Sequence, residues 1–304
     1  MQHTPVLYQE IIHALQPTSQ GRYVDGTVGT GGHAYGLLSA SSPNGRLLGL
    51  DLDPESLQVA RKRLEEFGDR VVLICSSYTE LRSHLNNLEW DTVDGILLDL
   101  GLSSLHLDRP DRGFSFRHAG PLDMRYDPSQ QVTAADLVNG LPREELANLI
   151  YRYGEERNSR KIADAIVANR PLETTQELAS LIARVIGTKS GSIHPATRTF
   201  QALRIAVNNE LERLKTVLPI ALESLNSGGR LAVIAFHSLE DRIVKRFFRR
   251  ESQDCICPPQ LPVCACDHEA QLKEISRRPI RPSEREREEN PRSRSAKLRV
   301  AEKL

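Results

Sequence analysis

The chain has 304 residues, and its 40 Lys and Arg balance its 40 Asp and Glu, so the net charge indicates no class of partner. This length permits one large domain or two smaller ones. No signal peptide is recognisable, and no apolar run approaches the roughly 18 residues of a membrane helix, so we expect a soluble, cytoplasmic protein. Five cysteines, an odd number, do not suggest a disulfide framework.

Taken in order, residues 7–15 predict a short amphipathic helix, and residues 22–100 then alternate apolar strands with helices. We expect a helix from His33, a second helix over 56–67 that stops at Gly68, and strands at 23–24, 47–50, 71–75 and 94–99. Such alternation is typical of a parallel, doubly wound sheet. In this class, ligands bind outside the carboxyl ends of the strands.

A glycine-rich turn joins the first strand to the first helix of this region. It contains Gly26, Gly29, Gly31 and Gly32, and the next strand ends in Asp51 about 20 residues later. Glycines let a backbone approach a ligand closely, and an acid at this spacing can bind both hydroxyls of a ribose. The pattern predicts a site for a cofactor that contains adenosine.

Two cofactors fit this turn. The spacing of Gly29, Gly31 and Ala34 satisfies a permissive dinucleotide fingerprint, which favours NAD. Asp25 before the glycines is more typical of S-adenosylmethionine sites. The turn alone does not decide between them. Four polar residues, Asp25, Asp51, Tyr78 and Asp99, follow four successive strands, and we expect all of them to line one crevice.

An insertion interrupts the sheet. The next apolar strand, 230–236, begins about 130 residues after Asp99, far more than an ordinary crossover needs. Inside this stretch, helices are predicted at 144–153, 159–169, 175–186 and 197–217, with Thr174 and Glu177 as a capping box. We therefore expect a discontinuous domain, 1–104 and 216–304, and an inserted helical domain, 105–215.

The closing segment is basic. Residues 242–250 contain five Lys or Arg and no acid, and eleven Lys or Arg against six Glu follow residue 272. The tail is either a solvated, disordered segment or a phosphate-binding one that contacts RNA.

Motifs along the whole chain resemble one family. They are His3-x-Pro-Val-Leu, Asp25-Gly-Thr-x-Gly-x-Gly-Gly-His33, Asp99-Leu-Gly-x-Ser-Ser104, Arg112-Gly-Phe-Ser-Phe, Gly120-Pro-Leu-Asp-Met-Arg125, Tyr153-Gly-Glu-Glu-Arg157, His194-Pro-Ala-Thr-Arg-Thr-Phe-Gln-Ala-Leu-Arg204, Phe236-His-Ser-Leu-Glu-Asp-Arg242 and Asn290-Pro-Arg-Ser-Arg-Ser. This set is similar to bacterial 16S rRNA cytosine-N4 methyltransferases. The resemblance implies a Rossmann-like class I methyltransferase sheet with an inserted helical domain. It implies S-adenosylmethionine as the methyl donor and a decoding-centre cytosine of 16S rRNA as the acceptor.

The resemblance also implies a set of cofactor-binding residues. Asp51, rather than Asp53, matches the acid on the ribose, and Tyr78 matches an aromatic beside the adenine. His106 matches a further contact at which other members have Gln. The full set is Gly31, Gly32, His33, Asp51, Tyr78, Asp99 and His106.

The chemistry requires a group that accepts a hydrogen bond from the cytosine amine, and it requires no metal. Many amino-methyltransferases have an Asp or Asn followed by two prolines and an aromatic at this point, whereas this chain has Asp99-Leu-Gly-Leu. Asp99 and His237 are the candidates for catalysis, and Ser103, Arg198 and Arg204 are candidates for RNA contact. The alternative is a non-catalytic RNA-binding assembly factor that retains the cofactor fold. The sequence does not decide whether the protein forms a homodimer. It also does not decide whether the substrate is free RNA or the assembled small subunit.

The late cysteines form two Cys-x-Cys pairs, at Cys255 and Cys257 and at Cys264 and Cys266. Four thiolates can bind zinc in a tetrahedron, although the gap within each pair is shorter than usual. Reduced surface thiols are the alternative. Cys75, inside a predicted strand, is expected in the core.

Overall fold

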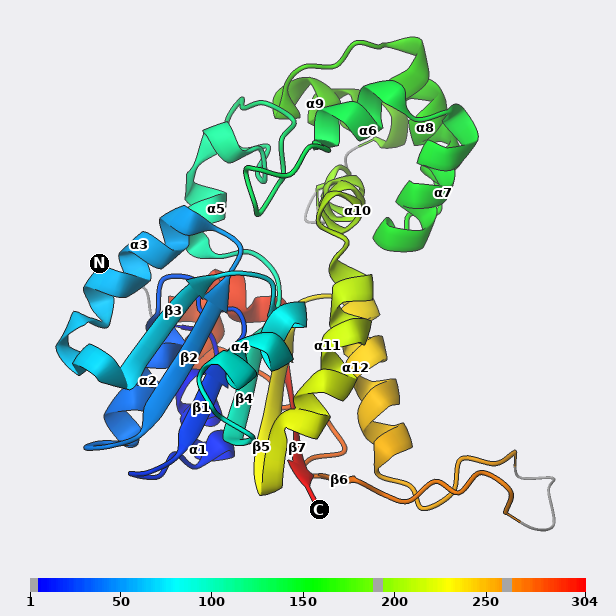
Figure 1. Cartoon of the computed structure of the whole chain (residues 1–304). Helices are drawn as coiled ribbons and strands as arrows, with labels where there is room; N and C mark the ends of the chain where they lie inside the picture. Colours follow the sequence, from blue (N-terminus) through cyan, green and yellow to red (C-terminus); the bar gives the residue numbers. More distant parts are fainter. Residues whose placement is uncertain (1–4, 188–193, 259–263) are drawn as a thin grey trace. The chain divides into compact units, whose positions relative to one another are not determined.

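The computed structural model describes residues 5–187, 194–258 and 264–304, so His3 of the first motif lies outside the described residues. The chain divides into two compact units. Unit 1 consists of Met1–Gly101 and Leu211–Leu304, and unit 2 of Leu102–Glu210. In Figure 1 the strands all belong to unit 1, and the green helices belong to unit 2.

A seven-stranded sheet forms the centre of unit 1, with the order β3-β2-β1-β4-β5-β7-β6. The strands β1 to β5 run parallel to one another, whereas β7 runs antiparallel to both of its neighbours. This arrangement confirms the predicted Rossmann-like α/β fold. The strands are β1 (Arg22–Asp25), β2 (Arg46–Asp51), β3 (Val71–Cys75), β4 (Val93–Asp99), β5 (Leu225–Ala235), β6 (Leu272–Glu274) and β7 (Lys297–Lys303).

Helices cover both faces of this sheet, because side chains of each strand alternate between the two sides. On one face, Val24 and Leu48 pack with buried residues of α4, α11 and α12. On the other face, Tyr23 and Leu47 pack with α1, α2 and α3. The bounds are α1 (Tyr8–Leu15), α2 (Gly32–Ala40), α3 (Pro54–Arg63), α4 (Leu81–Asn87), α11 (Glu210–Ser224) and α12 (Ser238–Glu251).

The prediction for α3 was wrong at both ends. The helix begins at Pro54, because the Asp53 side chain caps it and a proline is well suited to the first helical position. It ends at Arg63, and Gly68 lies in a following 3-10 segment with φ of 55°. Cys75 is exposed at the end of the edge strand β3, so its expected place in the core was wrong as well.

The basic segment after residue 272 is not a disordered tail. It contains β6, the helix α13 (Glu284–Glu289) and β7, which lies inside the sheet between β5 and β6. Asp241 of α12 accepts hydrogen bonds from Arg299 at 2.7 Å and Lys297 at 3.1 Å. Burial opposes the charged form of Asp241, but these two cations lower its pKa overall. Several of the basic residues thus hold the sheet together.

Unit 2 is helical, and its own apolar core is built from Leu146, Ile150, Ile162, Leu178 and Leu203 among others. The predicted capping box of Thr174 and Glu177 is present at the start of α9. The helices are α5 (Ser104–Asp108), α6 (Ala134–Gly140), α7 (Arg143–Gly154), α8 (Ser159–Ala168), α9 (Thr175–Ile186) and α10 (Thr197–Asn208).

The helix predicted over 197–217 is two helices. Asn209 ends α10 in the left-handed conformation with φ of 50°, which asparagine adopts more readily than most residues. The neighbouring Asn208 is buried, donates to the carbonyl of Met124 at 2.7 Å and accepts from the N–H of Tyr126 at 2.8 Å. The break therefore coincides with the boundary between the two units.

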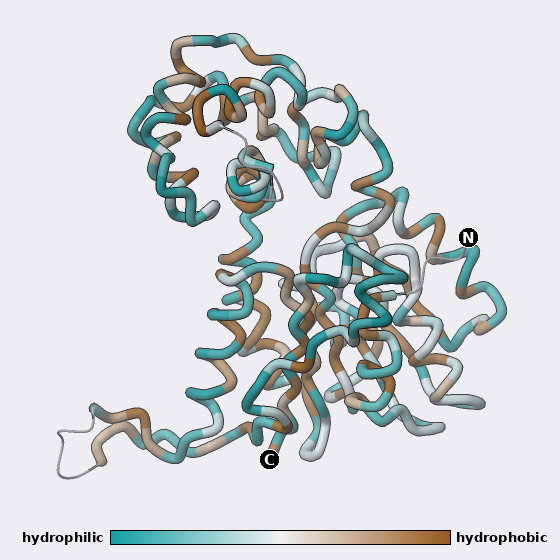
Figure 2. The backbone as a smooth tube through the Cα atoms, turned by 180° about the vertical axis from the view of Figure 1, so that it is seen from behind, coloured by the Kyte–Doolittle hydropathy of each residue, from teal (hydrophilic) through white to brown (hydrophobic). Residues whose placement is uncertain are grey.

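Hydrophilic and hydrophobic residues alternate along the helices (Figure 2). Across the residues that the structure describes, no helix combines the length and the apolar character needed to cross a membrane.

Candidate active site

The polar residues at the strand exits come together at one edge of the sheet. In the parallel pairing, Asp25 lies opposite Leu97 of β4 and Gly49 of β2, and Asp51 lies opposite Cys75 of β3. Asp25, Asp51 and Asp99 are therefore the last residues of three neighbouring strands. This edge is where a doubly wound sheet binds its ligands.

The glycine turn is shaped by its backbone and by packing. Gly29 and Gly31 have φ values of 50° and 79°, which side chains disfavour. A Cβ on Gly31 would lie 3.3 Å from Ala60 of α3, and one on Gly32 would lie 2.4 Å from Pro5. Glycine is thus required here partly because other segments of the protein pack closely against the turn. The sequence alone did not reveal this packing.

Asp51 organises this turn. Its carboxylate accepts hydrogen bonds from the N–H of Gly29 at 2.8 Å and from the N–H of Asp53 at 2.9 Å. A carboxylate can accept about four hydrogen bonds, so these two orient the group at the edge of the site. Asp53 has a different role, because it is fully buried and binds Glu55 N–H and the Ser56 hydroxyl at the start of α3.

Asp25, His33 and Asp99 form a polar cluster, in which Asp25 and His33 are buried and Asp99 is half-buried. The His33 Nε2 atom lies 3.6 Å from Asp99 Oδ2. Among the described residues, neither ring nitrogen of His33 has a hydrogen-bond partner, nor has Asp99 Oδ1, although all three atoms are buried. Buried polar atoms are normally hydrogen-bonded, so this cluster is suited to a polar ligand.

Asp25 was expected to line the crevice but was not among the predicted cofactor-binding or catalytic residues. Burial raises the pKa of its carboxyl to about 7, with Asp99 and Asp51 adding to the effect, while His33 and the N–H of Thr27 act against it. Perturbed carboxyls in a cleft are typical of functional sites. The signal was available in the sequence as an acid directly before the glycines, but its burial was not.

Thr27 connects two members of the cluster. Its N–H donates to Asp25 Oδ1 at 3.2 Å, and its hydroxyl accepts from the backbone N–H of Asp99 at 2.6 Å. Tyr78 begins a 3-10 turn after β3, half-buried, and its Cβ lies 3.2 Å from where a side chain on Gly26 would start. Thr27 thus links the exits of β1 and β4, and Tyr78 lies close to Gly26 at the exit of β1.

His237 follows β5, the strand next to β4. It is the N-cap of α12, where its Nδ1 accepts from the N–H of Glu240 at 3.4 Å, and its Nε2 lies 3.2 Å from the Glu240 carboxylate. Glu240 in turn accepts from the N–H of Phe236 at 2.9 Å. The ring is therefore held by the start of α12.

The remaining predicted residues belong to unit 2. Ser103 caps α5, accepting from the N–H of His106 at 3.3 Å. His106 is buried, with its ring 4.9 Å from that of Phe114 and 5.3 Å from that of Tyr126. An aromatic cluster therefore fixes the orientation of His106 within this unit.

Arg198 and Arg204 differ sharply in their surroundings. Arg204 is largely buried and binds both carboxylate oxygens of Glu210, at 2.8 and 2.9 Å. Arg198 is 58% exposed and lies 3.7 Å from Glu156. Arg204 serves the internal packing of unit 2, and only Arg198 presents its charge to solvent.

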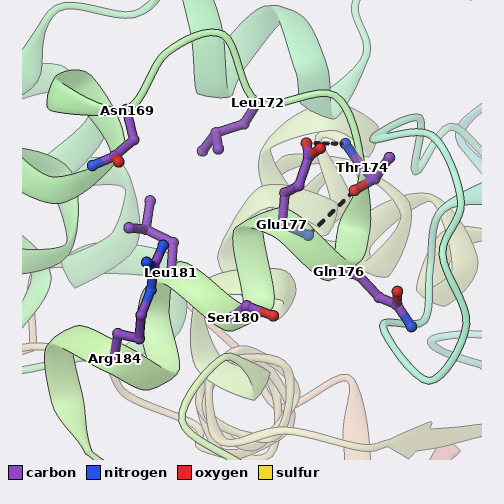
Figure 3. Close-up of a pocket in the computed structure, with 8 residues that line it drawn as sticks. All are labelled: Asn169, Leu172, Thr174, Gln176, Glu177, Ser180, Leu181 and Arg184. Carbon is purple, nitrogen blue, oxygen red and sulfur yellow. Dashed lines mark hydrogen bonds between the residues drawn. The ribbon is translucent and has the colours of Figure 1, made fainter.

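Unit 2 also contains a pocket at the start of α9 (Figure 3). Leu172, Thr174, Glu177, Leu181 and Arg184 are among the residues that line it. Thr174 and Glu177 bind each other there as the capping box of the helix. No residue of the predicted site lines this pocket.

A comparison with known families identifies the chain. The model of the MraW methylase family matches residues 1–304. The chain belongs to this family.

Curated relatives in the family are similar over nearly the whole chain. A protein of Dehalococcoides mccartyi named Ribosomal RNA small subunit methyltransferase H is 52% identical over 302 residues, which cover 99% of this chain and 86% of the relative. The protein of the same name from Heliobacterium mobile is 51% identical over 308 residues and covers 99% of both chains. That from Thermomicrobium roseum is 52% identical, covering 99% of this chain and 94% of the relative.

The edge of the sheet suits S-adenosylmethionine. Asp51 offers a carboxylate at the end of β2, where ribose hydroxyls could donate to it, and the glycines from Gly29 to Gly32 leave the backbone of the turn open to a ligand. The buried, unpartnered atoms of His33 and Asp99 can bind the polar amino acid end of the cofactor. The residues present therefore fit this group.

We predict that Asp51→Ala weakens binding of S-adenosylmethionine by about tenfold or more, since hydrogen bonds to a charged group contribute about 1.5–3 kcal/mol each. Asp53→Ala is the matched control. It removes the cap of α3, at a cost of about 1 kcal/mol of stability, but should alter affinity much less. Calorimetry at a temperature where both variants are folded measures the affinity for S-adenosylmethionine. Equal losses of affinity in the two variants would contradict the assignment of Asp51, rather than Asp53, to the ribose.

A second prediction concerns Asp25 and pH. Because the pKa of this acid is raised to about 7 in the folded protein from 3.8, the folded state keeps a proton that the unfolded chain loses. The contribution to stability is fully present below pH about 4 and is lost as pH rises to about 7, by up to about 4 kcal/mol. Asp25→Asn removes this dependence while keeping the oxygen that accepts from Thr27.

The measurement for Asp25 is the difference in free energy of unfolding between wild type and Asp25→Asn, by urea titration across this pH range. The wild type should lose stability relative to the variant as pH rises. Asp91→Asn, at an exposed position, controls for removal of one carboxylate. A difference that stays constant with pH for Asp25→Asn would contradict the raised pKa.

Proposed function

We propose that this protein transfers a methyl group from S-adenosylmethionine to the exocyclic N4 amine of a cytosine in 16S rRNA. The observation that carries this proposal is membership of the MraW methylase family over the whole chain. The polar cluster at the strand exits, with buried His33 and Asp99 atoms that lack a hydrogen-bond partner, is consistent with that activity. The curated relatives, by name, act on ribosomal RNA of the small subunit.

The cofactor is assigned to the edge of the sheet. Asp51 would bind the ribose hydroxyls and Tyr78 would lie beside the adenine, while His33 and Asp99 would bind the remaining polar groups. His106 is proposed as a further contact. When bound, S-adenosylmethionine supplies a methyl group activated by a sulfonium.

The amine of cytosine is a weak nucleophile because its lone pair is delocalised into the ring. The protein must therefore hold the amine in line with the methyl group, and positioning of this kind lowers barriers by about 7–11 kcal/mol in favourable cases. We propose that the Asp99 carboxylate, besides any contact with the cofactor, accepts a hydrogen bond from the amine. His237 is a weaker candidate because its ring is engaged by Glu240.

The target base must be unpaired or turned out of a helix to reach such a site. An exposed basic face is available to the flanking phosphates, since all five Lys and Arg of α12 are exposed. Arg198 and Ser103 of unit 2 are further candidates for RNA contact. We propose the decoding centre within the small subunit as the target, and the cytoplasm, where ribosomes are made, as the place of action.

One experiment tests the activity directly. The protein is incubated with labelled S-adenosylmethionine and small subunits that lack the modification, and the labelled nucleotide is mapped by mass spectrometry. Label on N4 of a cytosine in 16S rRNA is the expected result. Cofactor binding without any label on RNA would instead favour a non-catalytic assembly factor.

Asp99→Asn should separate catalysis from cofactor binding. The change keeps the shape of the side chain but removes its charge, and loss of a positioned proton acceptor typically reduces a rate by about 10²-fold or more. We expect this loss in single-turnover methyl transfer at saturating cofactor. A normal rate under these conditions, with weaker cofactor binding, would restrict Asp99 to the cofactor.

Arg198→Ala should weaken binding of 16S rRNA and reduce its salt dependence, with the slope of log affinity against log salt falling by roughly 0.7–0.9. Arg143→Ala is a matched control, because Arg143 is also a surface arginine of unit 2 paired with a carboxylate, that of Asp164. Binding isotherms at several salt concentrations measure both. A slope unchanged in Arg198→Ala would exclude a phosphate contact at this position.

A further inference from the structure

The two Cys-x-Cys pairs lie face to face beyond the end of α12. The described arms that contain them, up to residue 258 and from residue 264, run side by side (Figure 1). The Sγ atoms of Cys255, Cys257, Cys264 and Cys266 all lie within 4.8 Å of one another. The two pairs thus supply all four sulfurs of the cluster by themselves.

Two of the six sulfur–sulfur distances match those of a metal tetrahedron, and all six are within 4.8 Å. Zinc–sulfur bonds of about 2.3 Å place the four sulfurs of a tetrahedral site about 3.8 Å apart. The observed distance is 3.5 Å between Cys264 and Cys266, and 3.9 Å between Cys266 and Cys255. All four cysteines are free, and these separations are far longer than the roughly 2.05 Å of a disulfide.

Backbone groups around the sulfurs support the same interpretation. The N–H of Ile256, the middle residue of the first pair, points to Cys266 Sγ at 3.5 Å. The N–H of Ala265, the middle residue of the second pair, points to Cys257 Sγ at 3.3 Å. Each pair therefore donates to a sulfur of the other, and such donors outside the ligand shell orient and stabilise metal-bound thiolates.

In the described parts of this segment, no buried apolar side chain orders the chain. Among its described residues, 252–258 and 264–271, none is buried, and the side chain of Ile256 is exposed. Its base is fixed to α12, where Gln271 N–H donates to the carbonyl of Glu251 at 2.8 Å and His268 Nε2 lies 3.0 Å from the carbonyl of Arg250. A segment without a core needs a cross-link to hold its arms together, and a metal supplies one.

We propose that Cys255, Cys257, Cys264 and Cys266 bind one structural zinc ion. Four protein ligands close the coordination sphere, so the ion has no open position for substrate and its role is to fix the two arms at the end of the basic helix α12. The proposal is independent of the methyltransferase activity, because the cluster contains no residue assigned to the cofactor or RNA.

The test is metal analysis of the full-length protein, purified without chelators or nickel columns. We expect one zinc per chain in wild type, and a ratio lower by roughly tenfold or more in Cys257→Ser/Cys264→Ser, which leaves only half of the ligand set. Cys75→Ser, which removes an exposed cysteine outside the cluster, is the matched control and should keep one zinc. Cobalt substituted into the wild type should give the visible absorption of a tetrahedral thiolate site.

Further measurements distinguish a zinc site from misfolding, from an iron site and from disulfides. Calorimetric binding of S-adenosylmethionine by the double variant should be unchanged, which shows that its sheet unit is folded. Four thiols in metal-loaded wild type should resist alkylation until a chelator is added. Equally low zinc in wild type and double variant, iron in place of zinc, or a mass that shows two disulfides would each overturn the proposal.

Discussion

The two hydrogen bonds that Asp51 accepts are the constraint on which the candidate site depends. One ties the end of β2 to the glycine turn through Gly29, and the other ties it to the start of α3 through Asp53. The turn carries His33 into α2, and α3 packs so closely against Gly31 that a Cβ there would lie only 3.3 Å from Ala60. A single carboxylate therefore positions the turn, the first residues of two helices and, by our proposal, the cofactor.

The second constraint is electrostatic. Asp25, Asp51 and Asp99 end neighbouring strands, and among the described residues His33 is the basic group that acts on Asp25 and lies beside Asp99. Burial, with a smaller contribution from repulsion by Asp99 and Asp51, raises the pKa of Asp25 to about 7. A ligand with a positive centre would relieve this repulsion, and the sulfonium and amine of S-adenosylmethionine have that charge.

Much of this could be predicted from the sequence, because the relevant signals are local. Alternating strands and helices, the glycine turn, the acid at the end of β2 and the capping box at Thr174 all depend on residues close in the chain. The α3 bounds were missed although their signals, the Asp53 cap and Pro54, are local, whereas the other failures depend on distant contacts. At the break at Asn209, the neighbouring Asn208 binds Met124 and Tyr126. In the basic tail, Arg299 pairs with Asp241 of α12. Arg204 forms an internal ion pair with Glu210 and so does not present its charge to solvent. The amino-acid composition could not distinguish arginines and lysines that form internal ion pairs from those that bind phosphate.

The position of β7 has a consequence for the order of assembly during synthesis. Unit 2 is a continuous stretch and can form its core as soon as residue 210 has left the ribosome, whereas the sheet needs segments from both sides of it. Until residues 297–303 are made, β5 remains an edge strand with unpaired backbone groups, and β6 has no neighbour at all. During synthesis there is therefore a stage at which unit 2 can be folded while the sheet is incomplete and its edge strand is prone to aggregation. Chaperones that shield strand edges would act at that stage.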